Sequence, residues 1–377
     1  MNNKLHILFL CGWYPSRVLP TNGDFIERHA RAVSLKHKVT VFHMITDNNC
    51  IKNMEVVSTK EEHLTVHIAY IKPQKIILKK ILLFWKAYKL LLGKTDTFDV
   101  IHLNEIFPFG IFARQTSKKR NIPYLISEHF TGFLKTSNFK FSFLKKFISK
   151  HIIRNADTVC PVSNYLSENM QELGFDGNYV TVANVVDTDL FIPKEKDNKI
   201  LKLVHVSSLK DEHKNIKGML RVAKLLDEQV NDFEWKFIGN NGIGFKEFLK
   251  ELNIKNGKIS FIDHQTQEEL VTNLQNASVC ISFSNYETFG IVIPEAIACG
   301  TPVIATNTGI TIDFSEYDFC QVIPIKNEVL LLQEILNSKK TFANLEVEKM
   351  HHFIQQQFSK EVISNKFSLL YYQSLKR

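Results

Sequence analysis

The feature of this chain that most constrains its fold is an alternation of short apolar segments with amphipathic ones. In the first half, apolar runs predict buried strands at Lys4–Cys11, Lys38–Met44, Val100–Leu103, Tyr124–Ser127 and Thr158–Val162. Helical patterns, such as the one at Asp24–Leu35, lie between them. Because strands that alternate with helices form parallel sheets covered on both faces, this half predicts a doubly wound α/β domain.

The same alternation restarts after a polar, charged segment at Pro193–Lys199, whose composition predicts a linker. Strands are predicted at Lys202–Ser207, Glu234–Ile238, Ile259–Ile262, Val279–Phe283 and Pro302–Thr306, and helices at Asn215–Gln229, Gly244–Leu252, Thr266–Gln275 and Pro294–Cys299. A length of 377 residues also favours two domains. We therefore predict domains at residues 1–192 and 193–357, with an amphipathic C-terminal helix, residues 358–377, folding back on the first. Two such domains leave a ligand-binding cleft at the carboxyl ends of their strands.

Several classes of protein are disfavoured by composition. Hydrophobic residues make up 44% and charged residues 23%, as in ordinary globular proteins. The six cysteines form no C-x-x-C pair, which favours reduced thiols and a cytoplasmic setting and argues against a cysteine-ligated metal. No apolar run reaches the 18 or so residues of a membrane span.

The net charge of +8 is concentrated in the first half of the chain. Residues 1–190 hold 25 Lys and Arg against 16 Asp and Glu, so 25 − 16 = +9, and residues 191–377 hold 22 against 23, so 22 − 23 = −1. Such asymmetry indicates an anionic partner on one side: a membrane surface, nucleic acid or an acidic substrate.

The chemistry is concentrated in one segment, Val279–Thr306, which predicts a strand, a glycine-containing loop, a short helix and a second strand. Glu287 falls in the loop at the end of the first strand, and Glu295 falls in the first helical turn. Both carboxylates can accept hydrogen bonds from sugar or ribose hydroxyls. The N–H groups of residues 289–292 can receive a phosphate. The spacing alone is explained equally well by a solvated loop residue and a residue that favours the helix dipole.

The whole run resembles the retaining glycosyltransferases of family 4, which have the GT-B fold. Glu287 and Glu295 match the E-x7-E signature, within the Phe-Gly and Glu-Ala-x-Ala-x-Gly-x-Pro-Val context of that family. The resemblance implies that Glu287 contacts the donor sugar and Glu295 the ribose. It also implies that backbone amides at Phe289, Gly290 and Ile291 bind the diphosphate.

Other segments extend the resemblance over most of the chain. Gly23, in Asn22-Gly23-Asp24-Phe25, lies where the family lets its first loop approach the donor, although an ordinary strand-to-helix turn explains it as well. His129 lies where the family places a histidine near the donor sugar, with a structural histidine as the alternative. Gly239 follows a predicted strand, and we expect it to line the cleft wall.

Lys214 matches the lysine that clamps the diphosphate in family 4, just before a helix that Asn215 is expected to cap. The family usually has an arginine six residues earlier, and this chain has Ser208 there. Full neutralisation of the phosphates then requires Lys210 or a residue of the first domain. A second departure is that only Gly309 is kept where the family usually has two adjacent glycines, which indicates a different preference for the donor sugar.

The resemblance implies transfer of a sugar from a UDP- or GDP-sugar with retention of configuration, and with neither a protein nucleophile nor an obligatory metal. The expected acceptor is a lipid-linked or cell-surface polysaccharide precursor. Two alternatives are a GT-B-type sugar-nucleotide epimerase and a non-catalytic sugar-nucleotide-binding subunit, the latter favoured by Ser208. Nucleic-acid binding has no motif to support it.

Two basic, apolar-rich helices are predicted in the first half, Lys75–Leu92 and Phe139–Arg154. At about 100° per residue, Lys75, Lys79, Lys86 and Lys89 fall within an arc of about 80°. The second stretch carries Lys140, Lys145, Lys146, Lys150 and Arg154. These helices either rest on an anionic membrane, which would place the protein on the inner face of the cytoplasmic membrane, or pack on the sheet with solvated lysines.

Overall fold

The computed structural model describes residues 4–195 and 200–376, and two β-sheets organise them. The first sheet has seven strands in the order β3-β4-β2-β1-β5-β6-β7. Their bounds are β1 His6–Cys11, β2 Lys38–Thr46, β3 Met54–Lys60, β4 Leu64–Ile71, β5 Val100–Asn104, β6 Tyr124–Glu128 and β7 Thr158–Pro161. All of its strand pairs are parallel except β3 with β4.

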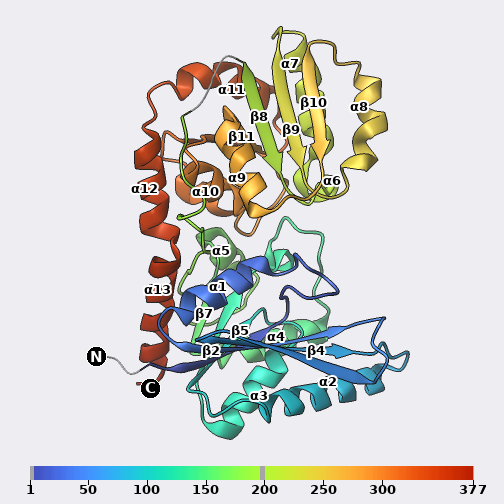
Figure 1. The fold of residues 1–377 in the computed structure, drawn as a ribbon, viewed down its shortest axis with the longest axis vertical. Coiled ribbons are helices and arrows are strands. Elements are labelled where there is room, and N and C mark those ends of the chain that lie inside the picture. Colours follow the sequence, from blue (N-terminus) through green and yellow to red (C-terminus); the bar gives the residue numbers. More distant parts are fainter. Residues whose placement is uncertain (1–3, 196–199, 377) are drawn as a thin grey trace.

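The second sheet has six parallel strands in the order β10-β9-β8-β11-β12-β13. Their bounds are β8 Leu201–Val206, β9 Phe233–Ile238, β10 Gly257–Ile262, β11 Val279–Ser282, β12 Val303–Thr306 and β13 Cys320–Ile323. The two α/β units lie one above the other along the long axis of the molecule (Figure 1). The predicted fold class, two doubly wound domains facing each other, is confirmed.

Helices connect the strands of both sheets. Those of the first unit are α1 Asp24–Ser34, α2 Ile77–Leu92, α3 Gly110–Arg120, α4 Phe143–Arg154 and α5 Asn164–Glu172, with a 3₁₀ turn η1 at Thr131–Phe133. Those of the second are α6 Asp211–Lys214, α7 Ile216–Asp227, α8 Lys246–Leu252, α9 Gln267–Asn276, α10 Val292–Ala298 and α11 Glu328–Thr341, with η2 Gly242–Phe245 and η3 Gly309–Phe314. Helices α12 Val347–Phe358 and α13 Lys360–Ser374 complete the chain.

The last helix returns to the first unit. α13 packs against α1, and α12 packs against α10 of the second unit, so this C-terminal pair runs along both units (Figure 1). A buried 2.6 Å hydrogen bond joins the Tyr371 hydroxyl to Nδ1 of His102 in β5. The predicted linker at Pro193–Lys199 lies partly outside the described residues, and the boundary after residue 192 stays a prediction.

The sequence did not reveal the β3–β4 hairpin, which adds an antiparallel strand to a sheet expected to be parallel. Strand β3, Met54-Glu55-Val56-Val57-Ser58-Thr59-Lys60, lies at the sheet edge and is mostly exposed, so its sequence has no buried apolar run to mark it. Asn215 does stand at the start of α7, but the expected side-chain cap is absent. Its backbone is left-handed there, with φ of 53°, and its side chain makes no capping hydrogen bond.

Candidate active site

Glu287 is held by charge in the loop that follows β11. Its side chain is 10% exposed, and Lys214 Nζ donates a hydrogen bond to Oε1. The Ser284 hydroxyl donates to the same oxygen at 2.9 Å. His213 Nε2 lies 3.7 Å from Oε2, which is beyond hydrogen-bond distance. Burial alone would raise the pKa of Glu287, but the charge of Lys214 and the nearby His213 hold it well below its usual range.

Lys214 lies just before α7, as expected, but it also ends a short helix that was not predicted. It is the last residue of the one-turn helix α6, and α7 begins two residues later. The left-handed residue Asn215 turns the chain between the two helices. The ammonium group is therefore turned toward the loop after β11, where its side chain is only 14% exposed.

A cavity of about 320 Å³ lies between the two units. From the first unit it is lined by Trp13, Phe25, His129, Thr131 and Asn184, and from the second by residues of β8, α6 and the loop 282–293. Six predicted site residues meet in its wall: His129, Lys214, Glu287, Phe289, Gly290 and Ile291. The fold thus brings together side chains that are more than 150 positions apart in the sequence.

His129 is one of the polar side chains that the first unit contributes to this wall. It is 5% exposed, and in the described part of the chain neither ring nitrogen has a hydrogen-bond partner. Burial lowers the pKa of this imidazole well below its usual value, with nearby His29 and His102 adding to the effect. A buried, neutral and unpaired imidazole at a cavity wall is free to bond a ligand hydroxyl or phosphate oxygen.

The backbone at Phe289, Gly290 and Ile291 forms the opposite part of the wall. Gly290 has φ of 84°, a conformation that favours glycine. Within residues 4–195 and 200–376, no hydrogen bond is recorded for the N–H groups of these three residues. Unpaired amide donors beside a lysine suit an anionic ligand.

Four other predicted residues lie outside the cavity wall. Glu295 is 2% exposed, and Arg28 of the first unit donates to its Oε1 at 2.7 Å. Gly23 has φ of 79° at the start of α1, where a Cβ would lie 2.7 Å from the Trp13 carbonyl carbon. Gly239 has φ of 142°, and a Cβ there would lie 1.7 Å from the Ser207 carbonyl oxygen. Ser208 is exposed. Gly23 and Gly239 thus allow close backbone packing beside the cavity.

The family models match two adjoining parts of the chain. The model for glycosyl transferases group 1 matches residues 187–324, and the model for glycosyltransferase family 4 matches residues 26–190. Together they span most of both units and include Lys214, Glu287 and His129. The chain belongs to glycosyltransferase family 4. It is therefore a glycosyltransferase of the GT-B type.

The chain is also similar to individual proteins, in sequence or in fold. An uncharacterized glycosyltransferase of Methanocaldococcus jannaschii is 25% identical over 59% of this chain and 60% of its own length. An uncharacterized protein in the cps region of Klebsiella pneumoniae is 24% identical over 88% of this chain and 95% of its own. Sucrose-phosphate synthase from Thermosynechococcus elongatus superposes with a TM-score of 0.79 at 19% identity, covering 98% of this chain and 99% of that one. The structural likeness shows the fold alone.

Several residues of this family 4 site were not found by sequence reasoning. Arg28 and Glu295 are 267 positions apart, and nothing local to either indicates their pairing. Trp13 had one weak signal, its place in Gly12-Trp13-Tyr14-Pro15 directly after the first predicted strand. The Ser163 hydroxyl donates to the Thr288 carbonyl across the two units, and nothing in the sequence indicates that contact. Contacts between domains depend on how the domains face each other, which a linear pattern does not encode.

Among the residues that the structure describes, no group of three or more His, Cys, Asp or Glu side chains is placed to hold a metal ion. None of the described helices is long and apolar enough to cross a bilayer.

Proposed function

We propose that this family 4 protein transfers a sugar from a UDP- or GDP-sugar to an acceptor with retention of anomeric configuration. The observation that carries the proposal is the ion pair of Lys214 and Glu287 in the wall of the interdomain cavity, beside three unpaired backbone amides. Solved structures with this fold include an Anabaena protein with UDP-glucose, 16% identical with a TM-score of 0.71 over 98% of this chain and 100% of that one.

The geometry suits departure of a nucleoside diphosphate. Negative charge develops on the diphosphate oxygen as the bond to the sugar C1 breaks, and preorganised cations and amides stabilise it. Lys214 and the amides of residues 289–291 supply these groups. Among the described residues that line the cavity, Lys214 is the sole Lys or Arg. Positive charge develops on the sugar at the same time, and the ionised Glu287 is suited to stabilise it and to accept bonds from sugar hydroxyls.

Ser208 leaves the position of the usual arginine without a cation, and two neighbouring cations are poorly placed to compensate for it. Lys210 is exposed and does not line the cavity. Arg28, a cation of the first unit, is already held by Glu295 and by Asp24 at 3.3 Å. This neutral position is the observation that favours the second candidate function, a subunit that binds a sugar nucleotide without turning it over.

A donor screen tests the proposal. We expect one nucleotide class among UDP-, GDP- and ADP-sugars to raise the melting temperature and to be hydrolysed slowly without acceptor. Lys214→Ala should abolish both effects, and Lys246→Ala, at an exposed helix position of the second unit, should abolish neither. Binding without turnover, persisting when membrane lipid extracts are added as acceptor, would support the non-catalytic subunit. Stabilisation by none of these donors would contradict the proposal.

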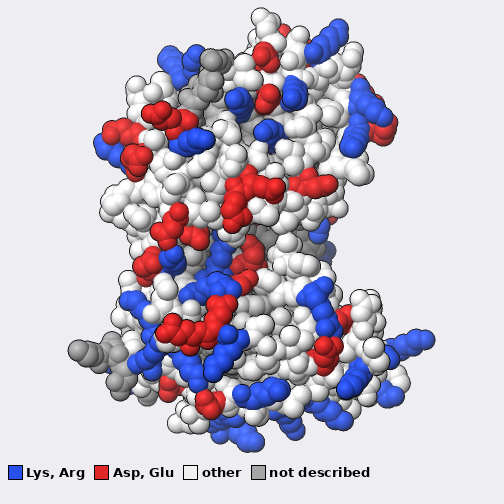
Figure 2. Space-filling view, in the orientation of Figure 1, with Lys and Arg blue, Asp and Glu red and all other residues white. Residues whose placement is uncertain are grey.

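The acceptor proposed here is a lipid-linked or cell-surface polysaccharide precursor, and the protein is proposed to bind the inner face of the cytoplasmic membrane. Helix α2 and the residue before it expose Ile76, Ile77, Leu78, Ile81 and Leu82 beside exposed lysines. Helix α4 exposes Phe143, Leu144 and Phe147 beside Lys145. In Figure 2, Lys and Arg side chains gather along the lower edge of the molecule, where Figure 1 places α2 and α3. Exposed apolar groups framed by lysines suit an anionic bilayer surface.

Removing three charges from α2 should weaken binding to anionic vesicles. For the triple variant Lys79→Gln, Lys86→Gln and Lys89→Gln, we expect a loss of about ten- to 100-fold in affinity at low salt, since each lysine near the surface contributes to attraction. Vesicle sedimentation with phosphatidylserine-containing liposomes measures this. A matched triple change in the second unit, at exposed Lys246, Lys255 and Lys258, should have little effect. Wild-type protein that stays in solution at low salt would contradict the membrane proposal.

A further inference from the structure

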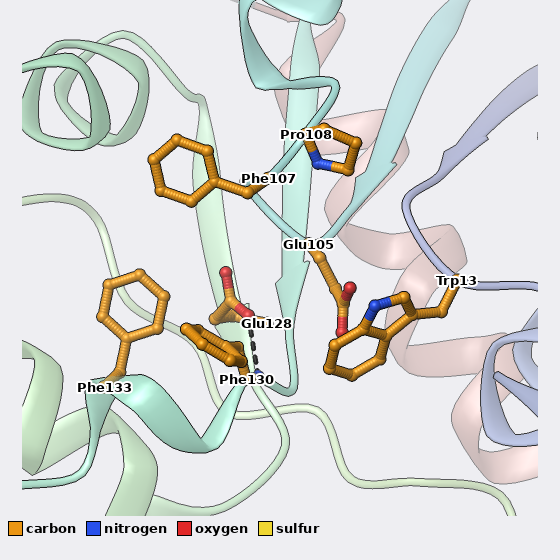
Figure 3. A pocket seen from close by; sticks show the side chains of 7 residues that line it. All are labelled: Trp13, Glu105, Phe107, Pro108, Glu128, Phe130 and Phe133. Carbon is orange, nitrogen blue, oxygen red and sulfur yellow. Dashed lines mark hydrogen bonds between the residues drawn. The ribbon is translucent and has the colours of Figure 1, made fainter. Parts of the chain in front are cut away.

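A second cavity, of about 270 Å³, lies in the first unit at the carboxyl ends of β5 and β6. It is lined by Trp13, Glu105, Phe107, Pro108, Glu128, Phe130 and Phe133. Figure 3 shows the two carboxyl groups between the aromatic side chains. Its polar side chains are thus almost wholly carboxyl groups, and its walls are aromatic. Neither the family signature nor the donor-site proposal uses this cavity.

Glu105 is the side chain of this cavity whose carboxyl group lacks a full set of hydrogen-bond partners. Its residue is 2% exposed, and its Oε1 is buried without a hydrogen-bond partner in the described part of the chain. Its backbone has φ of 69°, which is uncommon for a residue with a side chain. Burying an unpaired carboxyl group costs free energy, and so does such a backbone. A side chain kept at such cost inside a cavity indicates a bound partner.

Glu128, the other carboxyl group of the cavity, is held in place by backbone hydrogen bonds. Its two oxygens accept the backbone N–H groups of Ile106 at 3.2 Å and of His129 and Phe130 at 2.9 Å each. Burial raises the pKa of Glu128 to about 7, against the lowering effect of these donors. The same side chain therefore ties together the loops after β5 and β6.

Two glycines, Gly12 and Gly132, pack closely against residues of the cavity wall. A Cβ at Gly12 would lie 2.7 Å from the Phe107 carbonyl oxygen and 3.1 Å from Glu105 Oε2. A Cβ at Gly132 would lie 2.2 Å from the Phe130 ring. Glycine at these two positions lets the backbone approach the walls and keeps the rings in place.

The second cavity adjoins the candidate donor site. Trp13 lines both cavities. Its ring stands edge-on to Phe130 on one side, with centroids 6.3 Å apart, and to Phe25 on the other, at 6.2 Å. Phe25 in turn contacts the His129 ring at 4.6 Å. A group bound in the second cavity therefore lies one aromatic side chain away from the site of sugar transfer.

We propose that this cavity binds an uncharged sugar ring of the acceptor, with its hydroxyls donating to Glu105 and Glu128 and its C–H face resting on the aromatic walls. This inference rests on the proposed function, which makes the bound sugar part of the acceptor. Carboxylates accept hydrogen bonds, so a ligand rich in hydroxyl donors satisfies Glu105. An anionic ring would meet two carboxyl groups, and no Lys or Arg is among the described residues that line the cavity.

An uncharged ring is favoured over a cation by the state of the two carboxyl groups. Burial, together with the charge of Glu128, raises the pKa of Glu105 well above its usual value. A carboxyl group whose pKa is raised in this way takes up a proton more readily, so the cavity carries less negative charge than two ordinary carboxylates would give.

The test measures binding of small glycosides to the full chain, saturated with UDP or with the nucleotide that the donor screen identifies. The probes are methyl glycosides of glucose, galactose, mannose and N-acetylglucosamine, with those of glucuronic acid and glucosamine as charged counterparts. Saturation-transfer NMR detects binding and calorimetry ranks it. We expect at least one uncharged glycoside to bind, and Glu105→Gln to weaken it about tenfold or more. Exposed Glu251→Gln should leave it unchanged.

Donor binding distinguishes failure of this inference from failure of the proposed function. Glu105→Gln should leave nucleotide affinity intact, which also shows that the variant is folded. Phe107→Leu, which removes part of the aromatic wall, should weaken the same glycoside. The inference is overturned if nucleotides bind but no uncharged glycoside does, if either charged counterpart binds more tightly, or if Glu105→Gln keeps full affinity. Failure of every nucleotide to bind would instead sink the donor proposal.

Discussion

Glu287→Gln is expected to slow glycosyl transfer by about 100- to 1000-fold, the range seen when one preorganised electrostatic group is removed from an active site. Glutamine keeps the size of the side chain and can still accept the bond from Ser284. It removes the negative charge that faces Lys214 and that is suited to stabilise positive charge on the transferred sugar. The rate is measured with the donor that the screen identifies, as transfer or as slow hydrolysis.

Two comparisons make this result specific to charge at the site. Affinity for the nucleotide without its sugar should change less than the rate does, because the amides of residues 289–291 and Lys214 remain. Glu316→Gln, at an exposed position of the second unit, should keep wild-type activity. If Glu287→Gln retains more than a tenth of the wild-type rate, the carboxylate has no electrostatic role in transfer.

Arg28→Met is expected to destabilise the folded protein by about 3–5 kcal/mol, the usual cost of removing one partner from a buried ion pair. The side chains of Arg28 and Glu295 are 13% and 2% exposed, and their bond joins α1 of the first unit to α10 of the second. Burial raises the pKa of Glu295, and the charge of Arg28 limits that rise. Without Arg28, the carboxyl must take up a proton or remain charged and unpaired. Denaturant unfolding followed by tryptophan fluorescence measures the loss.

The chain supplies a matched control for this ion pair. Arg221 and Glu328 form a comparable bond on the surface, with side chains 47% and 26% exposed. Arg221→Met should cost less than about 1 kcal/mol, because solvent screens exposed pairs. The double variant Arg28→Met with Glu295→Met should recover much of the stability lost by Arg28→Met alone. Equal effects of Arg28→Met and Arg221→Met would show that the contact between the units contributes no more than a surface pair.

The predictable parts of the fold are those whose signal is local. Strand β11 and helix α10 were visible in the sequence because an apolar run, a Gly-containing loop and Pro294 follow one another within 20 or so residues. The exposed edge strand β3 lacked such a run and was missed. Lys214 was placed in the correct segment, but its one-turn helix was not predicted, because four residues carry too little pattern.

The residues of the candidate site likewise divide into those with a local signal in the sequence and those without one. Glu287 and Phe289–Ile291 share one loop, and the sequence identified them as a group. Their partners in the first unit have no local mark: Trp13 lines two cavities, and Arg28 pairs with a residue 267 positions away. Glu105 is followed by an apolar stretch and had no functional signal at all. Its unpaired oxygen became visible only with the side chains of β5, β6 and Trp13 in place.

By itself, the sequence determined two doubly wound units and the loop after β11, because strand and helix periods and glycine and proline positions act over a few residues. The tertiary structure alone decided which groups of the first unit face that loop, that Glu295 is paired rather than open to the cavity, and that a carboxyl-lined pocket adjoins the interdomain cavity. Those features depend on the packing of the two units and on the burial it imposes. Burial sets the charge of a side chain and removes its access to water, and no local pattern records it.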